Sequence, residues 1–155
     1  PNPFIHEILK LASKQRSKAK KVEILQQYEN DALKTIFIWN FDETVISVLP
    51  AGDVPFNKNE VPVGTDHTSL RREYKHLYNF VKGGNDGLSG LRRETMFIQM
   101  LEGLHPEEAE ILCLCKDKRL ADKYKITYDV VKQAFPDIQW GGRSWRLSNK
   151  IVIRV

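Results

Sequence analysis

Apolar residues recur every three or four positions along the first 40 residues of the chain. A helix over 3–16 would collect on one face the residues Phe4, Ile5, Ile8, Leu9 and Ala12. A second apolar stripe runs from Val22 to Trp39 and keeps helical phase, and Ser17 is a suitable N-cap for that longer helix. The pattern therefore predicts a helical hairpin over 3–39.

The helical pattern stops between residues 44 and 65. The run from Val45 to Leu49 is short and β-branched, so it predicts minor β structure near 44–49. Residues that break regular structure follow it: Pro50, Gly52, Pro55, Pro62 and Gly64. We expect a long irregular connection over 44–65.

Helical spacing returns in a body over 66–136, with helices expected at 68–82, 90–102, 106–116 and 127–135. His105-Pro106-Glu107-Glu108 is the clearest start signal, because proline and acidic residues suit the first turn of a helix. The inward-facing residues of the first two helices are expected to include Leu70, Tyr74, Leu77, Val81, Leu91, Ile98 and Leu101.

The chain ends in a basic arm over 137–155, in which the alternation from Lys150 to Arg154 predicts a strand or an ordered tail. Together these patterns predict a mainly α protein. Five or six helices would form one compact domain over 1–155, with minor β near 44–49 and at the C-terminus.

Positive charge is concentrated at both ends of the chain, which has a net charge of +4. Residues 1–22 carry six basic residues and one acidic residue, and residues 138–155 carry four basic residues and no acidic one. Such ends are typical of contact with phosphate, although they also serve solubility. The candidate nucleic-acid-binding residues of the two ends are Lys14, Arg16, Lys18, Lys20, Lys21, Arg143 and Arg146.

The tetrapeptide Leu-Arg-Arg-Glu occurs twice, at 70–73 and 91–94, each time near the start of an expected helix. Arginine there opposes the helix dipole, so a compensating negative charge is expected. Internal ion pairs with Glu107, Glu108 or Glu110 are the preferred explanation. The alternative is an external phosphate, which makes a second group of candidates: Arg71, Arg72, Arg92 and Arg93.

Two features of the C-terminal half are compatible with nucleic-acid contact without requiring it. Basic residues surround the helices expected at 106–116 and 127–135: Lys118, Arg119, Lys123, Lys125 and Lys132. The connection between those helices is too long for the usual helix-turn-helix reader. Trp140 and Trp145 flank Arg143, and such rings either stack on single-stranded bases or anchor the C-terminal arm, which is the preferred interpretation.

No catalytic or metal-binding constellation stands out, and no cofactor is expected. Asn40-Phe41-Asp42-Glu43-Thr44 is similar to the signature of haloacid-dehalogenase-type phosphatases, but asparagine replaces the nucleophilic aspartate. Cys113 and Cys115 would point to different sides of a helix, so they predict core residues rather than a zinc site. The cysteine usage favours a reducing, cytoplasmic compartment, and no apolar run approaches the ~20 residues of a membrane span.

The stretch 92–136, above all 93–110 and 126–136, resembles an uncharacterised protein family of T4-like tailed phages of marine bacteria. The opening Asn2-Pro3-Phe4 is similar to that family as well. The resemblance implies a phage protein in the cytoplasm of a bacterial host. It implies no activity and no site residues.

Two functional hypotheses remain. The first is a non-enzymatic accessory protein that binds nucleic acid non-specifically through its basic ends. The second is a protein-interaction or assembly factor that docks a partner through its acidic middle and its Trp-bearing C-terminal arm.

Overall fold

The computed structural model describes residues 3–60 and 67–142, and these residues are mainly helical, as predicted. The chain opens with α1 (Ile5–Lys14), α2 (Lys18–Gln27) and α3 (Asp31–Phe41). The single helix predicted from Ser17 to Trp39 is wrong, because the chain breaks at Asn30. The Asn30 side chain accepts a hydrogen bond from the Leu33 N–H and donates one to the Tyr28 carbonyl, which starts α3 as a separate helix.

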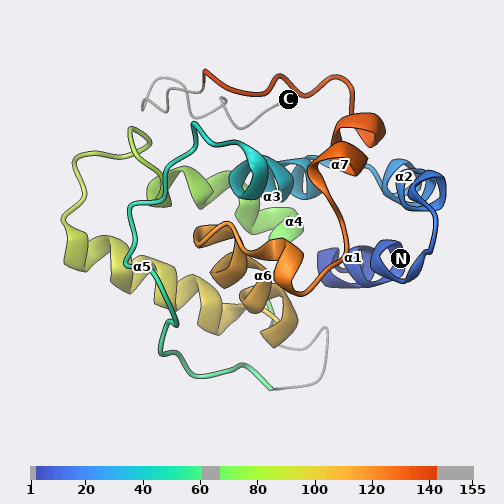
Figure 1. Cartoon of the computed structure of the whole chain (residues 1–155). Helices are drawn as coiled ribbons and strands as arrows, with labels where there is room; N and C mark the ends of the chain where they lie inside the picture. Colours follow the sequence, from blue (N-terminus) through green and yellow to red (C-terminus); the bar gives the residue numbers. More distant parts are fainter. Residues whose placement is uncertain (1–2, 61–66, 143–155) are drawn as a thin grey trace.

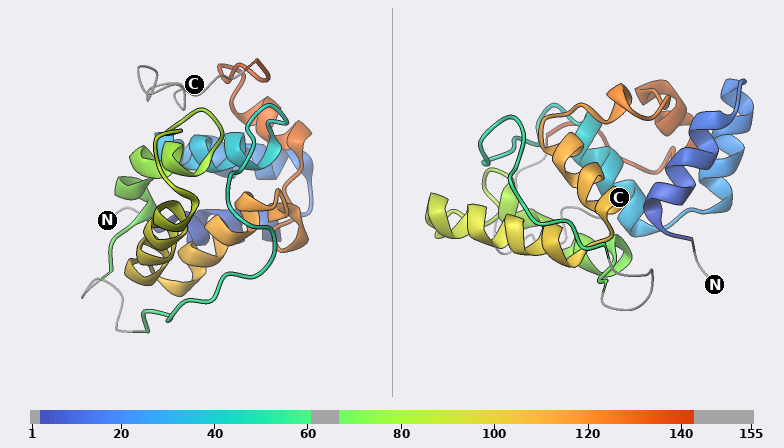
Figure 2. Two further views of the ribbon diagram at one scale, coloured as in Figure 1. Left: turned by 90° about the vertical axis from the view of Figure 1, so that its left-hand side faces the viewer. Right: turned by 90° about the horizontal axis from the view of Figure 1, so that it is seen from below.

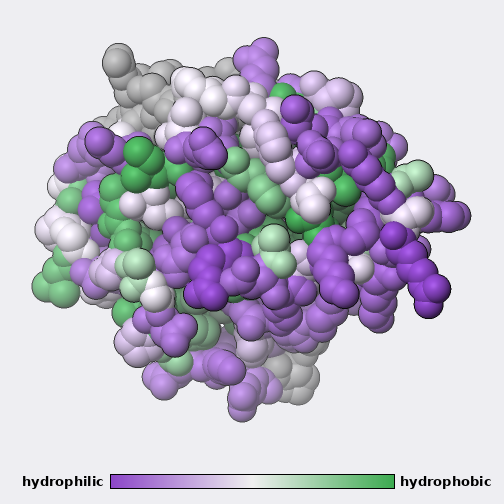
Figure 3. Space-filling view, in the orientation of Figure 1, coloured by the Kyte–Doolittle hydropathy of each residue, from purple (hydrophilic) through white to green (hydrophobic). Residues whose placement is uncertain are grey.

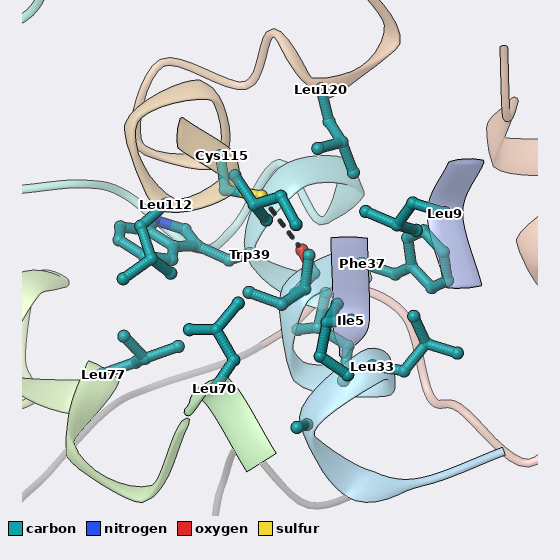
Figure 4. Packing of buried hydrophobic residues seen from close by; sticks show 14 of the residues in the cluster. Ile5, Leu9, Leu33, Phe37, Trp39, Leu70, Leu77, Leu112, Cys115 and Leu120 are labelled. Atoms are coloured by element: carbon teal, nitrogen blue, oxygen red, sulfur yellow. Dashed lines mark hydrogen bonds between the residues drawn. The ribbon is translucent and has the colours of Figure 1, made fainter. Parts of the chain in front are cut away.

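Helix α3 is the centre of the fold, and every residue from Ala32 to Asn40 is buried. It packs against α6 (Pro106–Lys116) and α4 (Leu70–Glu73), with α1 and α2 toward one edge of the molecule (Figure 1). At the contact between α3 and α6, the Cys115 thiol donates to the Ile36 carbonyl across 3.7 Å (Figure 4). Both cysteines are free, and Cys115 lies in the core, as the sequence predicts.

The helix expected over 68–82 is shorter and tighter than predicted. It consists of α4 and the 3₁₀-helix η1 (Tyr74–Phe80), and the chain is extended at Val81. Val81 forms an isolated antiparallel bridge with Ser47, in which the Val48 N–H donates to the Phe80 carbonyl and the Lys82 N–H to the Ile46 carbonyl. The helix ends early because Val81 is extended for this pairing. The minor β structure near 44–49 is reduced to this bridge among the described residues.

The C-terminal half contains α5 (Gly90–Gly103), α6, the short 3₁₀-helix η2 (Leu120–Asp122) and α7 (Tyr128–Ala134). The described residues thus hold seven α-helices rather than five or six. Leu91 was expected inside but is 79% exposed. It lies about 120° around the helix from the buried Phe97. Figure 2 shows α5 at the edge of the molecule opposite α1 and α2, with its start pointing outward.

One buried carboxylate ties three helices together. Glu108, in the first turn of α6, is 0% exposed. Its Oε2 accepts from the Ile5 N–H at 2.9 Å and its Oε1 from the Leu70 N–H at 3.1 Å. These are the first N–H groups of α1 and α4, which have no partner within their own helices. Burial raises the pKa of Glu108, although the two N–H donors act in the opposite direction.

Replacing Glu108 tests this arrangement. The Glu108→Gln variant keeps the shape but turns an NH₂ group toward one of the two N–H donors. We expect the free energy of unfolding to fall by about 2–3 kcal/mol. The control is Glu110→Gln on the same helix. Its exposed side chain pairs with Lys123, so this change should alter stability by less than about 0.5 kcal/mol. Urea denaturation of both variants measures the difference, and equal midpoints would contradict the assignment.

Candidate nucleic-acid interface

The predicted basic residues of the N-terminal segment gather where α1 turns into α2. Lys14 ends α1, Arg16 lies in the turn, and Lys18 and Lys20 belong to the first turn of α2. All four side chains are exposed. The turn is fixed by Ser17, whose hydroxyl accepts from the Lys20 N–H at 3.2 Å. The N-terminal half of the predicted site is therefore one local surface.

The structure adds a residue from the distant end of the chain to this surface. The Lys125 N–H donates to the Ser13 hydroxyl at 2.9 Å, and the Lys21 ammonium donates to the Lys125 carbonyl. The segment before α7 is thereby held beside the α1–α2 turn. We call the resulting surface the basic corner, which consists of Lys14, Arg16, Lys18, Lys20, Lys21 and Lys125.

The basic corner keeps its positive charge. Among the described residues, Lys14, Arg16, Lys18, Lys20 and Lys125 form no ion pair, and α2 has no acidic residue in its first turn. Basic residues elsewhere differ, since Lys10 pairs with Glu107 and Lys123 with Glu110. In Figure 3 hydrophilic side chains cover the right-hand edge of the molecule, over α1 and α2.

The repeated arginines do not join this surface. The Arg93 guanidinium donates to the backbone carbonyls of Asn79, Asn85 and Leu88, at 2.8–3.3 Å. Arg93 therefore fastens the loop before α5, at the edge opposite the basic corner (Figure 2). The neighbouring Arg92 is exposed.

The other arginine pair is divided in the same way. The Arg71 Nε donates to the Pro3 carbonyl at 3.0 Å, and Arg72 is exposed. Pro3 precedes α1, so Arg71 lies about 15 Å along that helix from Lys14. Leu70 is buried whereas Leu91 is exposed, so the repeated tetrapeptide does not mark two equivalent positions.

The expected ion pairs of these arginines with Glu107, Glu108 and Glu110 are absent from the described residues. Glu107 pairs with Lys10, Glu110 pairs with Lys123, and Glu108 accepts two backbone N–H groups. Backbone carbonyls are the partners of Arg71 and Arg93 instead. Arg143 and Arg146 lie outside the described residues.

A second feature is a hollow of about 670 Å³ between the end of α3 and the start of α7. It is lined by the segment 40–44, which the sequence flagged through its likeness to a phosphatase signature, and by Lys118, Tyr128 and Trp140. We call it the aromatic hollow. The Tyr128 and Trp140 rings meet edge to face, with centroids 5.0 Å apart. Trp140 thus packs on the body of the protein, as the anchor interpretation predicts.

The charged groups around this hollow serve the ends of helices. Asp42 Oδ1 accepts from the N–H and the hydroxyl of Thr44, and its Oδ2 accepts from the Gly141 N–H at 3.0 Å. The Lys118 ammonium donates to the carbonyls of Trp39 and Asp42, where α3 ends. Burial lowers the pKa of Lys118, yet its hydrogen bonds mark a cap for the negative end of α3 rather than a catalytic amine.

Three histidines gather at the start of α6 in a group that we call the histidine stack, in which two rings are stacked and the third is tilted by 59°. His6 and His105 are parallel with ring centroids 4.6 Å apart, and His67 lies 5.4 Å from His105. Nδ1 of His105 accepts from the Glu107 N–H at 3.1 Å, so the neutral ring caps α6. The three histidines are far apart in the sequence, and the packing of α1 on α6 and the bridge between Thr68 and Leu104 bring them together.

Other chemistry is sparse within the described residues. Burial raises the pKa of the Cys113 thiol to about 11 and that of Cys115 further still, so neither is a ready nucleophile. No group of three or more His, Cys, Asp or Glu side chains in 3–60 and 67–142 is placed to hold a metal ion.

None of the helices in 3–60 and 67–142 has the length and the apolar character of a membrane-spanning helix.

Comparison with known proteins places the chain in a family. The model of a family of unknown function, DUF6433, matches residues 8–122, which is most of the chain. The protein belongs to this family. No curated protein and no solved structure matched in the same comparisons. The matched range runs from the middle of α1 to the end of η2 and therefore includes the basic corner except for Lys125.

The adjacent pair Arg92 and Arg93 offers a matched test of the arginine assignment. Arg93→Gln cannot reach three carbonyls, so we expect the free energy of unfolding to fall by about 1–3 kcal/mol with no change in nucleic-acid affinity. Arg92→Gln removes the same charge from an exposed position and should leave stability within about 0.5 kcal/mol of the wild type. Thermal melts and binding titrations of both variants test this. If the Arg93→Gln variant is stable but binds nucleic acid more weakly, Arg93 belongs to the interface.

The histidine stack predicts a loss of stability in mild acid. Burial lowers the pKa values of His6 and His105 below the ordinary 6.5; neighbouring histidine charge and Lys10 add to this, while Glu107 and Glu7 oppose it. Since the unfolded histidines bind protons first, their contribution is present above pH 6.5 and is lost as the pH falls through the folded pKa values.

His105→Asn keeps an N-cap acceptor without a titrating ring, so its thermal midpoint should fall less steeply than that of the wild type between about pH 7 and 5. The exposed His76→Asn is the control and should follow the wild type. An unchanged slope in His105→Asn would exclude His105 as a source of the pH dependence.

Proposed function

We propose that this protein is a non-enzymatic accessory protein that binds nucleic acid without sequence preference through the basic corner. The observation that carries the proposal is the meeting of six basic side chains at the α1–α2 turn, none of which has a carboxylate partner among the described residues. A surface of this kind attracts phosphate by charge, and its binding releases the counterions condensed on the nucleic acid. Amide and arginine side chains that read base edges are sparse there, which favours binding independent of sequence.

The setting of the proposed function follows from the resemblance of 93–110 and 126–136 to proteins of T4-like tailed phages. We propose that the protein acts in the cytoplasm of an infected bacterium, where phage nucleic acid is abundant. Of the two groups of candidate residues, the N-terminal group makes the surface. Arg71 and Arg93 have structural hydrogen bonds instead.

A protein-docking role is the alternative proposal. It is favoured by Leu91, which is 79% exposed at the outward end of α5. Trp140, which the sequence offered as a docking residue, is half-buried and packs edge to face against Tyr128. Capture of a partner that disappears on Leu91→Ser and survives nuclease treatment would favour this alternative.

The salt dependence of binding tests the nucleic-acid proposal. The triple variant Lys18→Gln, Lys20→Gln, Lys125→Gln should bind duplex DNA more weakly at low salt. The slope of log K against log salt concentration should become shallower by about 0.9 for each phosphate that the variant no longer neutralises. Fluorescence anisotropy at several salt concentrations measures both quantities.

The matched control removes three exposed charges elsewhere through Arg72→Gln, Lys75→Gln and Arg92→Gln. It lowers the net charge equally, so it should show less than half of the change in slope. If both triple variants behave alike, general charge rather than the basic corner drives binding. No binding of DNA or RNA at low salt would remove the proposal.

A further inference from the structure

The aromatic hollow lies next to the basic corner along the chain and in space. Tyr128 begins α7 only three residues after Lys125, which is at most about 10 Å of backbone. Helix α7 packs against α2, which carries Lys18, Lys20 and Lys21 (Figure 1). Lys132, on the same helix, holds its ammonium 5.0 Å from the centre of the Tyr128 ring. Positive charge therefore continues from the basic corner to the edge of the hollow.

Aromatic rings form one wall of the hollow. Phe41, Tyr128 and Trp140 all line it, and the Phe41 and Tyr128 centroids are 6.2 Å apart. Tyr128 is 38% exposed and Trp140 is half-buried, so part of each ring is accessible among the described residues. A planar ring of another molecule can stack on such surfaces, as unpaired bases do on proteins that bind single strands.

The other wall carries the carboxylates of Asp42 and Glu43 and the ammonium of Lys118, which donates to the carbonyls at the end of α3. Asp42 is engaged by its neighbours Thr44 and Gly141. Glu43 also lines the hollow, is exposed, and accepts no hydrogen bond from the described residues. The two carboxylates and one ammonium leave this wall with a net negative charge, which disfavours a phosphate, whereas an exocyclic amino group of a base can donate to the Glu43 carboxylate.

We propose that the aromatic hollow binds one unpaired base that carries an exocyclic amino group. The base stacks on the Trp140 ring, meets the nearly perpendicular Tyr128 ring edge to face and donates its amino group to Glu43, while the phosphates of the same strand lie on the basic corner. This inference rests on the proposed function and deepens it, because it makes a single strand the preferred substrate and adds a preference at one base to the sequence-independent contacts of the basic corner. A cationic side chain of a protein partner is the other occupant that an acidic aromatic site can take. The positive basic corner beside the hollow disfavours it.

The test uses labelled oligo(dC) and oligo(dT) of about 12 nucleotides, a duplex of equal length, and a lysine-rich peptide. The wild type should bind oligo(dC) more tightly than oligo(dT), which lacks the amino group, and both more tightly than the duplex. Trp140→Leu should weaken binding of oligo(dC) about five- to hundredfold and leave the duplex affinity unchanged. A thermal melt of this variant confirms that it is folded.

Glu43→Ala separates stacking from base choice. It should bring the affinities for oligo(dC) and oligo(dT) within about twofold of each other. Glu94→Ala, which removes an exposed carboxylate from α5, should keep the wild-type ratio. If Trp140→Leu does not fold, Tyr128→Leu gives the same comparison from the opposite side of the ring pair.

The outcomes distinguish this inference from the function on which it rests. Equal affinity for duplex and single strands, with Trp140→Leu and Glu43→Ala both without effect, overturns the base site. In that case the salt dependence predicted for the basic corner still holds. Tighter binding of the lysine-rich peptide than of oligo(dC), abolished in Trp140→Leu, overturns it in favour of a cationic partner. Absence of all nucleic-acid binding removes the proposed function as well.

Discussion

The arrangement of this protein depends on one buried negative charge. Glu108 enters the interior on the first turn of α6 and accepts the leading N–H groups of α1 and α4. A buried carboxylate is costly unless its oxygens are hydrogen-bonded, and the start of a helix supplies donors that need a partner. The same group thus satisfies two helix ends and fixes the directions in which α1 and α4 leave the centre. The histidine stack and the Arg71–Pro3 hydrogen bond lie around this point.

The direction of α1 in turn decides where the charge of the N-terminal segment is displayed. Because the first N–H of α1, that of Ile5, is bound to Glu108, the basic end of α1 lies a full helix length away, at the edge of the molecule. There Ser13 and Lys21 hold the segment before α7, and Lys125 joins the surface. Lys118 is also held by the fold in a specific position. It adopts a left-handed conformation with φ 57°, which usually favours glycine. Its ammonium is the group that closes the end of α3.

Local signals in the sequence were sufficient for some elements and insufficient for others. The start of α6 follows from His105-Pro106 and that of α7 from Thr127, because caps act within a few residues. The break at Asn30 and the extended backbone at Val81 were missed. In both places an apolar stripe continues through the residue, and that stripe alone predicts an unbroken helix. Of the candidate site, the exposed residues 14–21 could be found from charge. The carbonyl partners of Arg93 depend on the fold of a loop, and Lys125 depends on Ser13, 112 positions away.

The long separation between Lys21 and Lys125, 104 positions, also bears on how the protein reaches its native state. Contacts between distant segments form late, because the entropy of closing a long loop must first be overcome. During synthesis the α1–α2 turn leaves the ribosome long before the segment that completes its surface. Partly made or clipped chains would present the N-terminal lysines without the neighbouring loop. Full affinity would therefore report that the last third of the chain has folded back onto the first.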